Sequence, residues 1–234
     1  TFVARGAHLE AIRNKGLQVK SRFGDFNVDN VKATNRITEL DPPDLILLGV
    51  KAWQIKEIRD ELKTILKKET MILPMQNGVL AASELSERID KRNILGGLCR
   101  IISKIDSPGV IQHVGVKPTI VFGELDKAVS DRVTKVNDLF QTAGIDSKIS
   151  EDIEADLWRK FIAICVSGLL AVSNTTYGEL RETKETRKLM IALFNEIYLL
   201  AKKIGVNIES DFVEKTVAFI DSFPFESTSS LTRD

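Results

Sequence analysis

The fold class of this chain follows from Leu45-Ile46-Leu47-Leu48-Gly49-Val50, a continuous apolar run of strand length. Such a run is typical of a strand that is buried on both faces, as in a parallel sheet. Asp41-Pro42-Pro43-Asp44 breaks the chain before it, and a helix with polar residues along one side fits residues 53–67 after it. Met71-Ile72-Leu73-Pro74 is a second short run of the same kind. This strand–helix–strand order predicts an α/β fold with a doubly wound sheet.

The same alternation extends on both sides of this stretch. Towards the N-terminus, Thr1–Ala4 fits a strand, Ala7–Lys15 a helix, and Val19–Val31 two short strands around the turn Phe23-Gly24-Asp25. Towards the C-terminus, we predict helices over 79–90 and 128–142, and strands that begin at 93–95 or lie near 99–105, 110–114, 119–122 and 147–149.

The pattern changes near Glu151. Helical stretches at 152–172, 184–203 and 210–221 follow one another with no convincing strand between them. We therefore predict two domains, an α/β domain over 1–149 and an all-α domain over 150–234.

Composition narrows the classes of function. The 33 basic residues offset 33 acidic ones, so the net charge gives no reason to expect a nucleic-acid partner or an anionic membrane. The longest apolar run, Phe161–Val172, is too short to span a bilayer. Cys99 and Cys165 lie in apolar surroundings, which predicts buried thiols in a reducing compartment such as the cytoplasm. Because His8 and His113 are the only histidines, we expect no metal site, and acid–base chemistry falls mainly to lysines, carboxylates or hydroxyls.

The glycines do not form the loop that usually opens a dinucleotide-binding sheet, because none has the spacing G-x-G-x-x-G. The fold still fits if Thr1–Ala4 is the second strand, with the first strand and the loop about two dozen residues upstream. At the end of the second strand an acid binds the ribose of NAD, whereas an arginine accommodates the extra phosphate of NADP. Arg5 stands there, with no acid before Glu10. Arg5 is thus a candidate phosphate ligand, and the alternative is a solvated surface arginine.

Six short motifs occur in the order and spacing of one enzyme family: Thr-Phe-Val-Ala-Arg-Gly-Ala-His-Leu-Glu-Ala-Ile (1–12), Val-Lys-Ala-Trp-Gln (50–54), Met-Gln-Asn-Gly-Val (75–79), Leu-Trp-Arg-Lys-Phe (157–161), Gly-Glu-Leu-Arg (178–181) and Ser-Ser-Leu-Thr-Arg-Asp (229–234). On these motifs, which cover essentially the whole chain, the sequence resembles the ketopantoate reductases (2-dehydropantoate 2-reductases). The resemblance implies a Rossmann-like N-terminal domain that binds NADPH, an all-α C-terminal domain, and an active site in the cleft between them.

The resemblance also implies roles in the N-terminal domain. By analogy, Arg5 meets the 2′-phosphate of NADPH, Lys51 binds the cofactor, and Asn77 contacts cofactor and substrate. Lys51 and Asn77 each follow a predicted buried strand, which places them at the edge where open α/β sheets bind ligands. The alternatives are a solvated loop lysine and a plain Asn77-Gly78 turn.

Lys160 aligns with the catalytic lysine of the family, and the resemblance makes it the proton donor in hydride transfer to a 2-oxo acid. It stands at the edge of the apolar run Phe161–Val172, with Asp156 one turn earlier as a potential ion-pair partner. Helical spacing places Ile164 and Gly168 on the same face as Lys160. The alternative is an ordinary surface lysine beside a buried face.

Four further positions concern the substrate. Ile164 and Gly168 stand where the family has substrate-contacting asparagines, and Tyr177 also replaces an asparagine of the family pattern. Ser230 matches the substrate-binding serine of the family, and a helix N-cap at Ser229-Ser230 is the alternative. Because an apolar Ile164 cannot make the hydrogen bonds of an amide, these departures leave the identity of the 2-oxo acid open.

Three functions therefore remain. The first is NADPH-dependent reduction of 2-dehydropantoate to pantoate in pantothenate synthesis. The second is reduction of another branched or bulky 2-oxo acid, and the third is a nucleotide-binding regulatory role without turnover. We expect a small 2-oxo acid as the partner of a monomer or homodimer, with no nucleic acid and no membrane. The family carries a glutamate beyond the serine motif that contacts substrate and cofactor, so we expect the chain as written to be catalytically incomplete.

Overall fold

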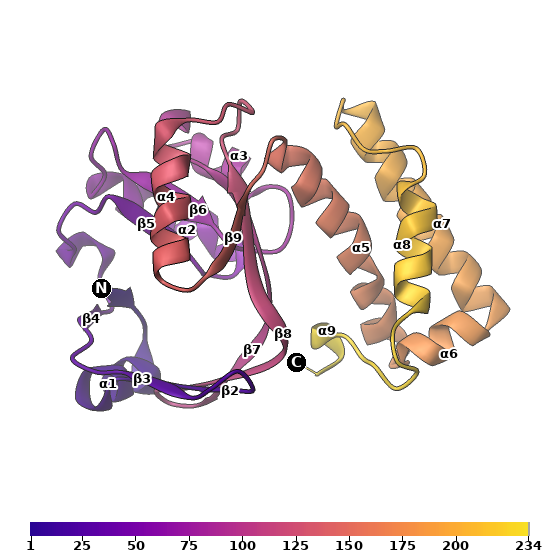
Figure 1. Cartoon of the computed structure of the whole chain (residues 1–234), viewed down its shortest axis with the longest axis horizontal. Helices are drawn as coiled ribbons and strands as arrows, with labels where there is room; N and C mark the ends of the chain where they lie inside the picture. The colour runs from indigo at the N-terminus through magenta and orange to yellow at the C-terminus, as the bar shows by residue number, and fades with distance from the viewer. Residues whose placement is uncertain (234) are drawn as a thin grey trace. The chain divides into compact units, whose positions relative to one another are not determined.

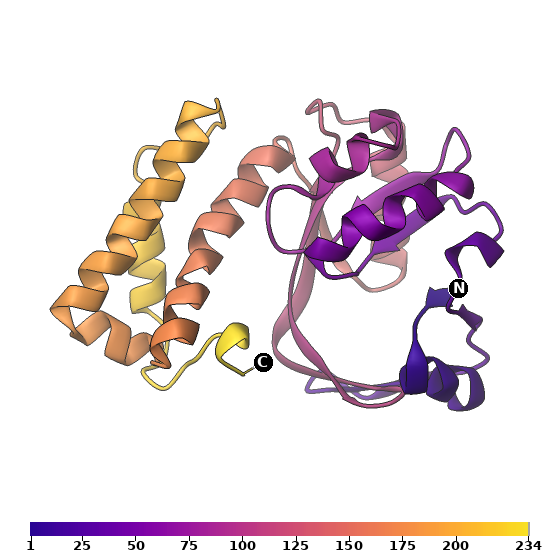
Figure 2. The same cartoon turned by 180° about the vertical axis from the view of Figure 1, so that it is seen from behind.

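A computed structural model of the chain describes residues 1–233, with the side chains of Ser230 and Arg233 outside the description. The chain divides into two compact units, Thr1–Ile153 and Glu154–Asp234. Their elements are labelled in Figure 1 and seen from behind in Figure 2. The N-terminal unit mixes helices and strands, whereas every regular element in the described part of the C-terminal unit is a helix. The predicted fold class is confirmed.

Two pairs of short parallel strands form one part of the N-terminal unit. β1 (Phe2–Val3) pairs with β4 (Ala33–Thr34), and β5 (Leu45–Leu48) pairs with β6 (Met71–Pro74). The α-helices and 3₁₀ turns of this part are α1 (Gly6–Lys15), η1 (Ile37–Glu39), η2 (Ala52–Gln54), α2 (Ile55–Thr64), α3 (Ala81–Ser86) and η3 (Lys91–Asn93).

The helix predicted over 79–90 is shorter in the structure. It begins only at Ala81, after a turn in which Gly78 has φ 106°. It ends at Ser86, and Asp90 then starts the separate turn η3 by accepting a hydrogen bond from the backbone N–H of Arg92 at 2.9 Å. An aspartate that caps the next turn therefore divides what the apolar spacing predicted as one helix.

A five-stranded mixed sheet forms the second part of the unit, in the order β3-β2-β8-β7 with β9 beside β8. Its strands are β2 (Leu17–Ser21), β3 (Phe26–Val28), β7 (Gly96–Ser107), β8 (Val110–Gly123) and β9 (Asp146–Ile149). The strands predicted at 110–114 and 119–122 are one strand, β8, and that prediction was wrong. Gly115 has φ 82°, and the register with β7 shifts between Arg100 and Ile102, so a bulge carries β8 past the interruption in its pattern.

Helices cover both faces of β6. Ile72 and Leu73 are each 0% exposed, but their side chains enter different apolar clusters. Ile72 packs in the cluster of Ile55, Ile58 and Leu62 from α2, whereas Leu73 packs in the cluster of α4 (Asp131–Thr142). Figures 1 and 2 show α2 and α4 on opposite sides of the strand. Two buried faces explain the continuous apolar sequence of the strand.

The described part of the C-terminal unit contains α5 (Ile153–Ser173), α6 (Tyr177–Glu182), α7 (Lys184–Lys203), α8 (Phe212–Asp221) and α9 (Ser230–Arg233). A two-pronged ion pair joins α7 to α8, because both terminal nitrogens of Arg187 lie 2.7 Å from carboxylate oxygens of Asp221. Arg181 of α6 donates to the carbonyls of Ile220 and Phe223 at the end of α8. These contacts fix the three helices against one another.

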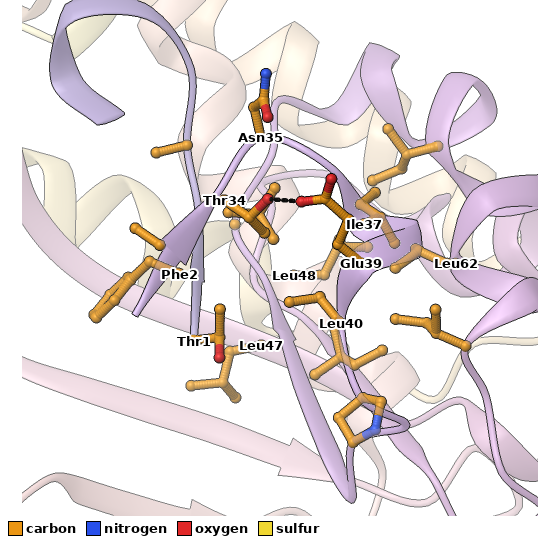
Figure 3. Close-up of a pocket in the computed structure, with 18 of the residues that line it drawn as sticks. Thr1, Phe2, Thr34, Asn35, Ile37, Glu39, Leu40, Leu47, Leu48 and Leu62 are labelled. Carbon is orange, nitrogen blue, oxygen red and sulfur yellow. Dashed lines mark hydrogen bonds between the residues drawn. The ribbon is translucent and has the colours of Figure 1, made fainter. Parts of the chain in front are cut away.

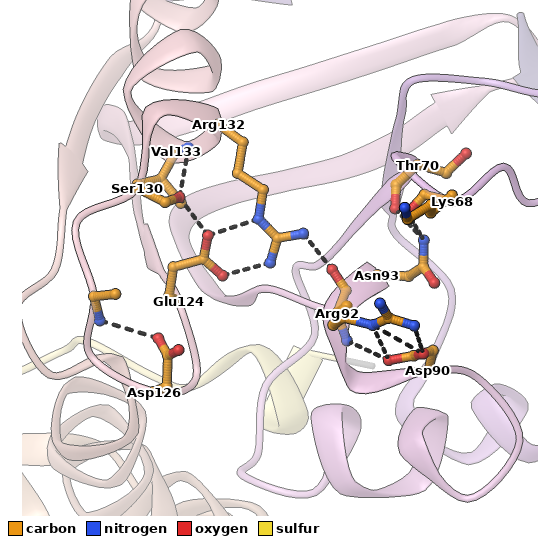
Figure 4. A network of polar contacts seen from close by, with 11 residues as sticks. Lys68, Thr70, Asp90, Arg92, Asn93, Glu124, Asp126, Ser130, Arg132 and Val133 are labelled. Atoms are coloured by element: carbon orange, nitrogen blue, oxygen red, sulfur yellow. Dashed lines mark hydrogen bonds and ion pairs between the residues drawn. The ribbon is translucent and has the colours of Figure 1, made fainter.

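A buried carboxylate joins the end of β8 to the start of α4 (Figure 4). Glu124 is 7% exposed and accepts hydrogen bonds from Ser130 Oγ and Arg132 Nε at 2.5 and 2.6 Å, while Arg132 also donates to the carbonyl of Arg92. Burial alone would raise the pKa of Glu124, but the hydrogen bonds from Arg132 and Ser130 outweigh it and hold this pKa below its ordinary value.

Replacing Glu124 with glutamine removes this charge at nearly constant volume. Because Arg132 then keeps a partly buried charge without its counterion, we expect the free energy of unfolding to fall by about 2 kcal/mol at pH 7. The folded-state pKa is lowered, so this stabilisation is present above the pKa of an unfolded glutamate and is lost as the pH falls through the folded value. Urea unfolding at pH 7 and pH 3 measures both effects.

The control is Asp90→Asn, which removes an exposed ion pair with Arg92 and is expected to change stability little. An effect of Glu124→Gln no larger than that of the control, or one that persists unchanged at pH 3, would contradict the prediction.

Candidate functional site

The structure brings Lys51 and Asn77 to one edge of the β5–β6 pair. Leu48 is opposite Pro74 where the two strands end, and Lys51 and Asn77 each lie three residues farther on. Both side chains are exposed, and the Lys51 ammonium lies 6.0 Å from the centre of the Trp53 ring. An exposed ammonium and a carboxamide at the carboxyl ends of parallel strands suit a ligand with negative and polar groups.

Gln76, which the sequence analysis did not single out, ties this edge together. Its amide Nε2 donates to the carbonyl of Leu48 at 2.8 Å, and the backbone N–H of Met75 donates to the same carbonyl at 3.0 Å. Gln76 is 8% exposed, and its Oε1 is buried without a hydrogen-bond partner among the described residues. In the sequence, the signal for this role of Gln76 was only that a polar residue stands directly before Asn77. Its partner Leu48 is remote in sequence, so the contact itself was not predictable.

Arg5 lies directly beyond β1 at the N-cap position of α1, and its side chain makes no capping hydrogen bond. Its backbone is extended (φ −135°, ψ 158°), its side chain is exposed, and no acidic residue lies in the first turn of α1. Unpaired amides at a helix N-terminus carry a partial positive charge that favours anions. The guanidinium and the helix end together form a place where a phosphate is electrostatically favoured.

A cavity of about 1200 Å³ lies beside this position in the N-terminal unit (Figure 3). Arg5 borders it from the side of β1, and Gly49 and Val50, which follow β5, border it from the other side. The residues at the ends of β1 and β5 therefore flank one open space.

Lys160 lies on α5 in the C-terminal unit and is half-buried. The neighbouring Arg159 binds Asp156 at 2.9 Å and Glu209 at 3.0 Å. Asp156, the expected partner of Lys160, is thus also engaged by Arg159. An ammonium partly withdrawn from water interacts more strongly with a developing anion than a fully solvated one does.

Ile164 and Gly168 follow Lys160 at successive turns of α5, and both are half-buried. A Cβ atom built on Gly168 would meet no heavy atom within 4 Å. On this face of α5, Lys160 is therefore followed by the apolar side chain of Ile164 and then by open space at Gly168.

The segment between α8 and α9 connects three of the other candidate positions. The backbone N–H of Tyr177 donates to the carbonyl of Ser227 at 2.9 Å, and Ser229 Oγ donates to the carbonyl of Ser167 at 3.3 Å. The structure thus brings Gly168, Tyr177 and the start of α9 into one region of this unit. Tyr177 is 7% exposed, with its ring edge-on to Phe223 at 4.8 Å.

Ser229 is the N-cap of α9, since its Oγ accepts a hydrogen bond from the backbone N–H of Thr232 at 3.1 Å. The capping role considered for Ser229-Ser230 is therefore present at Ser229. The side chain of Ser230, the predicted substrate ligand, lies outside the described residues.

The remaining predictions concern thiols, metals and membranes. Cys99 and Cys165 are half-buried rather than buried. Cys99 packs against the apolar cluster that contains Phe122 and Phe140. Partial burial raises the pKa of Cys165. Among the described residues no group of three or more His, Cys, Asp or Glu side chains is placed to hold a metal ion. No helix in the described part of the chain is long and apolar enough to cross a membrane.

Known proteins resemble this chain over both units. Residues 1–127 match the family model described as ketopantoate reductase PanE/ApbA, and residues 152–234 match the model of its C-terminal part. A curated 2-dehydropantoate 2-reductase from Nostoc sp. is 31% identical over 211 residues, which cover 88% of this chain and 66% of that protein.

Solved structures agree with these matches. The crystal structure of 2-dehydropantoate 2-reductase from Geobacter metallireducens has a TM-score of 0.89 and 27% identity, covering 100% of this chain and 77% of that chain. D-Mandelate dehydrogenase, solved with NADH and anilino(oxo)acetate, has a TM-score of 0.84 over 97% of this chain and 74% of its own, and at 20% identity it shares the fold alone. Because family models match both the α/β unit and the helical unit, the chain belongs to the ketopantoate reductase PanE/ApbA family of oxidoreductases.

Proposed function

We propose that this protein reduces 2-dehydropantoate to pantoate with NADPH, and that Lys160 donates the proton. The observation that carries the proposal is the family match of both units, together with a half-buried lysine at residue 160. The chain spans 66% of the length of the Nostoc relative, so the activity is proposed for the full-length protein.

The residues present fit a nicotinamide cofactor with an extra phosphate. Arg5 offers a fork of N–H donors beside a helix N-terminus whose first turn holds no acid. An enzyme that selects NAD normally has an acid here to bind the ribose hydroxyls. Lys51 and Asn77 supply further donors at the carboxyl edge of β5 and β6. These features support NADPH over NADH.

Reduction of a 2-oxo acid requires one proton to be delivered to the carbonyl oxygen of the substrate. A bound nicotinamide cofactor supplies the hydride that reduces the carbonyl carbon of the 2-oxo acid. Negative charge then builds on the carbonyl oxygen, and the Lys160 ammonium stabilises it and gives up a proton to form the hydroxyl group of the product. Lys160 is half-buried, so part of the water around its side chain is excluded, and this strengthens the interaction.

A second candidate is reduction of a 2-oxo acid with a bulky apolar side chain. It is favoured by the half-buried Ile164 and by the open space at Gly168, where the family pattern has amides. A surface of this kind accepts an apolar group without leaving a polar one unpaired.

Arg5→Ala tests the cofactor. Losing a charge-assisted contact to the 2′-phosphate is expected to raise the dissociation constant of NADPH by about tenfold or more in the full-length protein, while that of NADH stays the same. Fluorescence titration measures both constants. Arg22→Ala, at the exposed turn between β2 and β3, is the control and should change neither. An equal effect of Arg5→Ala on both dissociation constants would show that Arg5 does not recognise the 2′-phosphate.

Lys160→Ala tests the proton donor. We expect kcat to fall about 10²- to 10⁴-fold with the NADPH dissociation constant unchanged, because the side chain acts on the transition state rather than on the cofactor. Absorbance of NADPH follows turnover, and Lys188→Ala on the exposed face of α7 serves as the matched lysine control. NADPH oxidation at the wild-type rate would disprove the mechanism and favour a regulatory role without turnover.

The double variant Ile164→Asn/Gly168→Asn tests the substrate. The wild type is expected to show a higher kcat/KM for 2-dehydropantoate than for phenylglyoxylate, and the added amides should raise this ratio by at least about tenfold. Val172→Asn, one turn beyond Gly168 and 85% exposed, should leave the ratio unchanged. A wild type that prefers phenylglyoxylate would reject 2-dehydropantoate as the substrate and favour the second candidate.

A further inference from the structure

A short irregular segment, residues 224–229, connects α8 to α9 in the C-terminal unit (Figure 1). We call this segment the strap. The carbonyls of Phe225 and Ser227 accept hydrogen bonds from α6, and Ser229 Oγ donates one to the carbonyl of Ser167 on α5. The strap is therefore attached to α6 at one end and to α5 at the other.

The hydrogen bonds at α6 involve amides that a helix cannot pair by itself. The first backbone N–H groups of a helix have no carbonyl of the same helix to bind. In α6, the N–H of Tyr177 donates to the carbonyl of Ser227 and that of Gly178 to the carbonyl of Phe225, both at 2.9 Å. Tyr177 and Gly178 are buried, so these amides need a partner within the protein. The strap supplies that partner and so completes the first turn of α6.

Gly178 allows the strap to approach α6 this closely. A Cβ atom built on Gly178 would overlap the aromatic ring of Phe225. Gly178 is not among the glycines with a positive φ, so its backbone conformation is open to any residue. What this position requires is therefore the absence of a side chain rather than the conformational freedom of glycine.

The other end of the strap fixes the start of α9. Ser229 is 5% exposed, and its Oγ donates to the carbonyl of Ser167 at 3.3 Å. The same oxygen accepts a hydrogen bond from the backbone N–H of Thr232 at 3.1 Å and caps α9. Because Ser167 directly precedes Gly168, the cap holds the beginning of α9 next to that turn of α5.

We propose that Gly178 is a positioning residue for the 2-oxo acid: by admitting Phe225 it docks the strap on α6, and the docked strap holds the start of α9, with Ser230, beside Gly168. This inference rests on the proposed function, in which Ser230 and the face of α5 that carries Gly168 bind the substrate. Gly178 itself touches no substrate and acts through the backbone of the strap.

Positioning of this kind acts on the substrate and not on the cofactor. The residues proposed to bind NADPH, namely Arg5, Lys51 and Asn77, all belong to the N-terminal unit, whereas the strap and its contacts belong to the C-terminal unit. A contact that is made equally with the substrate and with the transition state changes KM and leaves kcat unchanged. Loss of the docked strap should therefore raise KM alone.

Gly178→Ala in the full-length protein is the test, because it places a methyl group against the Phe225 ring. We expect KM to rise at least about tenfold for whichever of 2-dehydropantoate and phenylglyoxylate the wild type reduces better. The kcat value and the NADPH dissociation constant should stay within about threefold of the wild type. Amide hydrogen exchange, measured by mass spectrometry, should become at least about tenfold faster at residues 177–178. Glu182→Ala, at the exposed other end of α6, is the control and should change none of these quantities.

A second substitution separates the steric mechanism from general damage to the unit. Phe225→Ala removes the ring that the added methyl group would overlap, but it keeps the backbone carbonyl that accepts from residue 178. Gly178→Ala/Phe225→Ala should therefore return KM and the exchange rate at 177–178 to within about threefold of Phe225→Ala alone. If Gly178→Ala does not fold, Ser229→Ala releases the other end of the strap and should raise the same KM about threefold or more.

A double variant as impaired as Gly178→Ala overturns the proposal, and so does an unchanged KM in Ser229→Ala. Faster exchange with an unchanged KM also overturns it, because the strap would then only connect α8 to α9. These results concern a wild type that is active. A wild type that reduces neither acid contradicts the proposed function itself, so the two failures are distinguishable.

Discussion

Burial of β6 on both faces is the constraint on which the N-terminal unit depends. Ile72 and Leu73 are adjacent, so their side chains point to opposite faces, and each is enclosed by a different helix layer. The start of the strand is also fixed, because the Asn93 amide donates to the carbonyl of Thr70 at 2.7 Å. A shift of register by one residue would exchange the two faces. With β6 fixed at both ends, the position of Asn77 beyond it is fixed as well.

The sequence predicted the elements whose signal is local. The apolar runs at β5 and β6 were correctly predicted as strands, and so were the long helices of the C-terminal unit. Burial on both faces holds for β6 but not for β5, where Leu48 is buried and Leu47 is 51% exposed. β8 was predicted as two strands, and only the register with β7 shows that the chain continues through Gly115. The short helix α6 was missed, although Thr176 and Glu179 form a capping box that was visible as a Thr-x-x-Glu pattern.

The candidate site was predictable to the same extent. Lys51 and Asn77 follow two parallel strands, so their common edge followed from the order of elements alone. The role of Gln76 depends on a carbonyl 28 residues away, and no local pattern announces such a contact. Asp156 has Arg159 and Lys160 at helical spacings of three and four, and the structure shows that Arg159 shares its charge between Asp156 and Glu209. The roles in cofactor and substrate binding remain predictions.

The balance of charges bears on the proposed binding of an anionic cofactor. A chain with 33 basic and 33 acidic residues has no net field to draw an anion from a distance. Attraction for a phosphate must then arise within a few ångströms, where Arg5 stands beside amides of α1 and no acid lies in the first turn. Screening by salt is weak over so short a range. In the proposed function, recognition of an anionic cofactor therefore depends on the absence of nearby carboxylates as much as on the presence of Arg5.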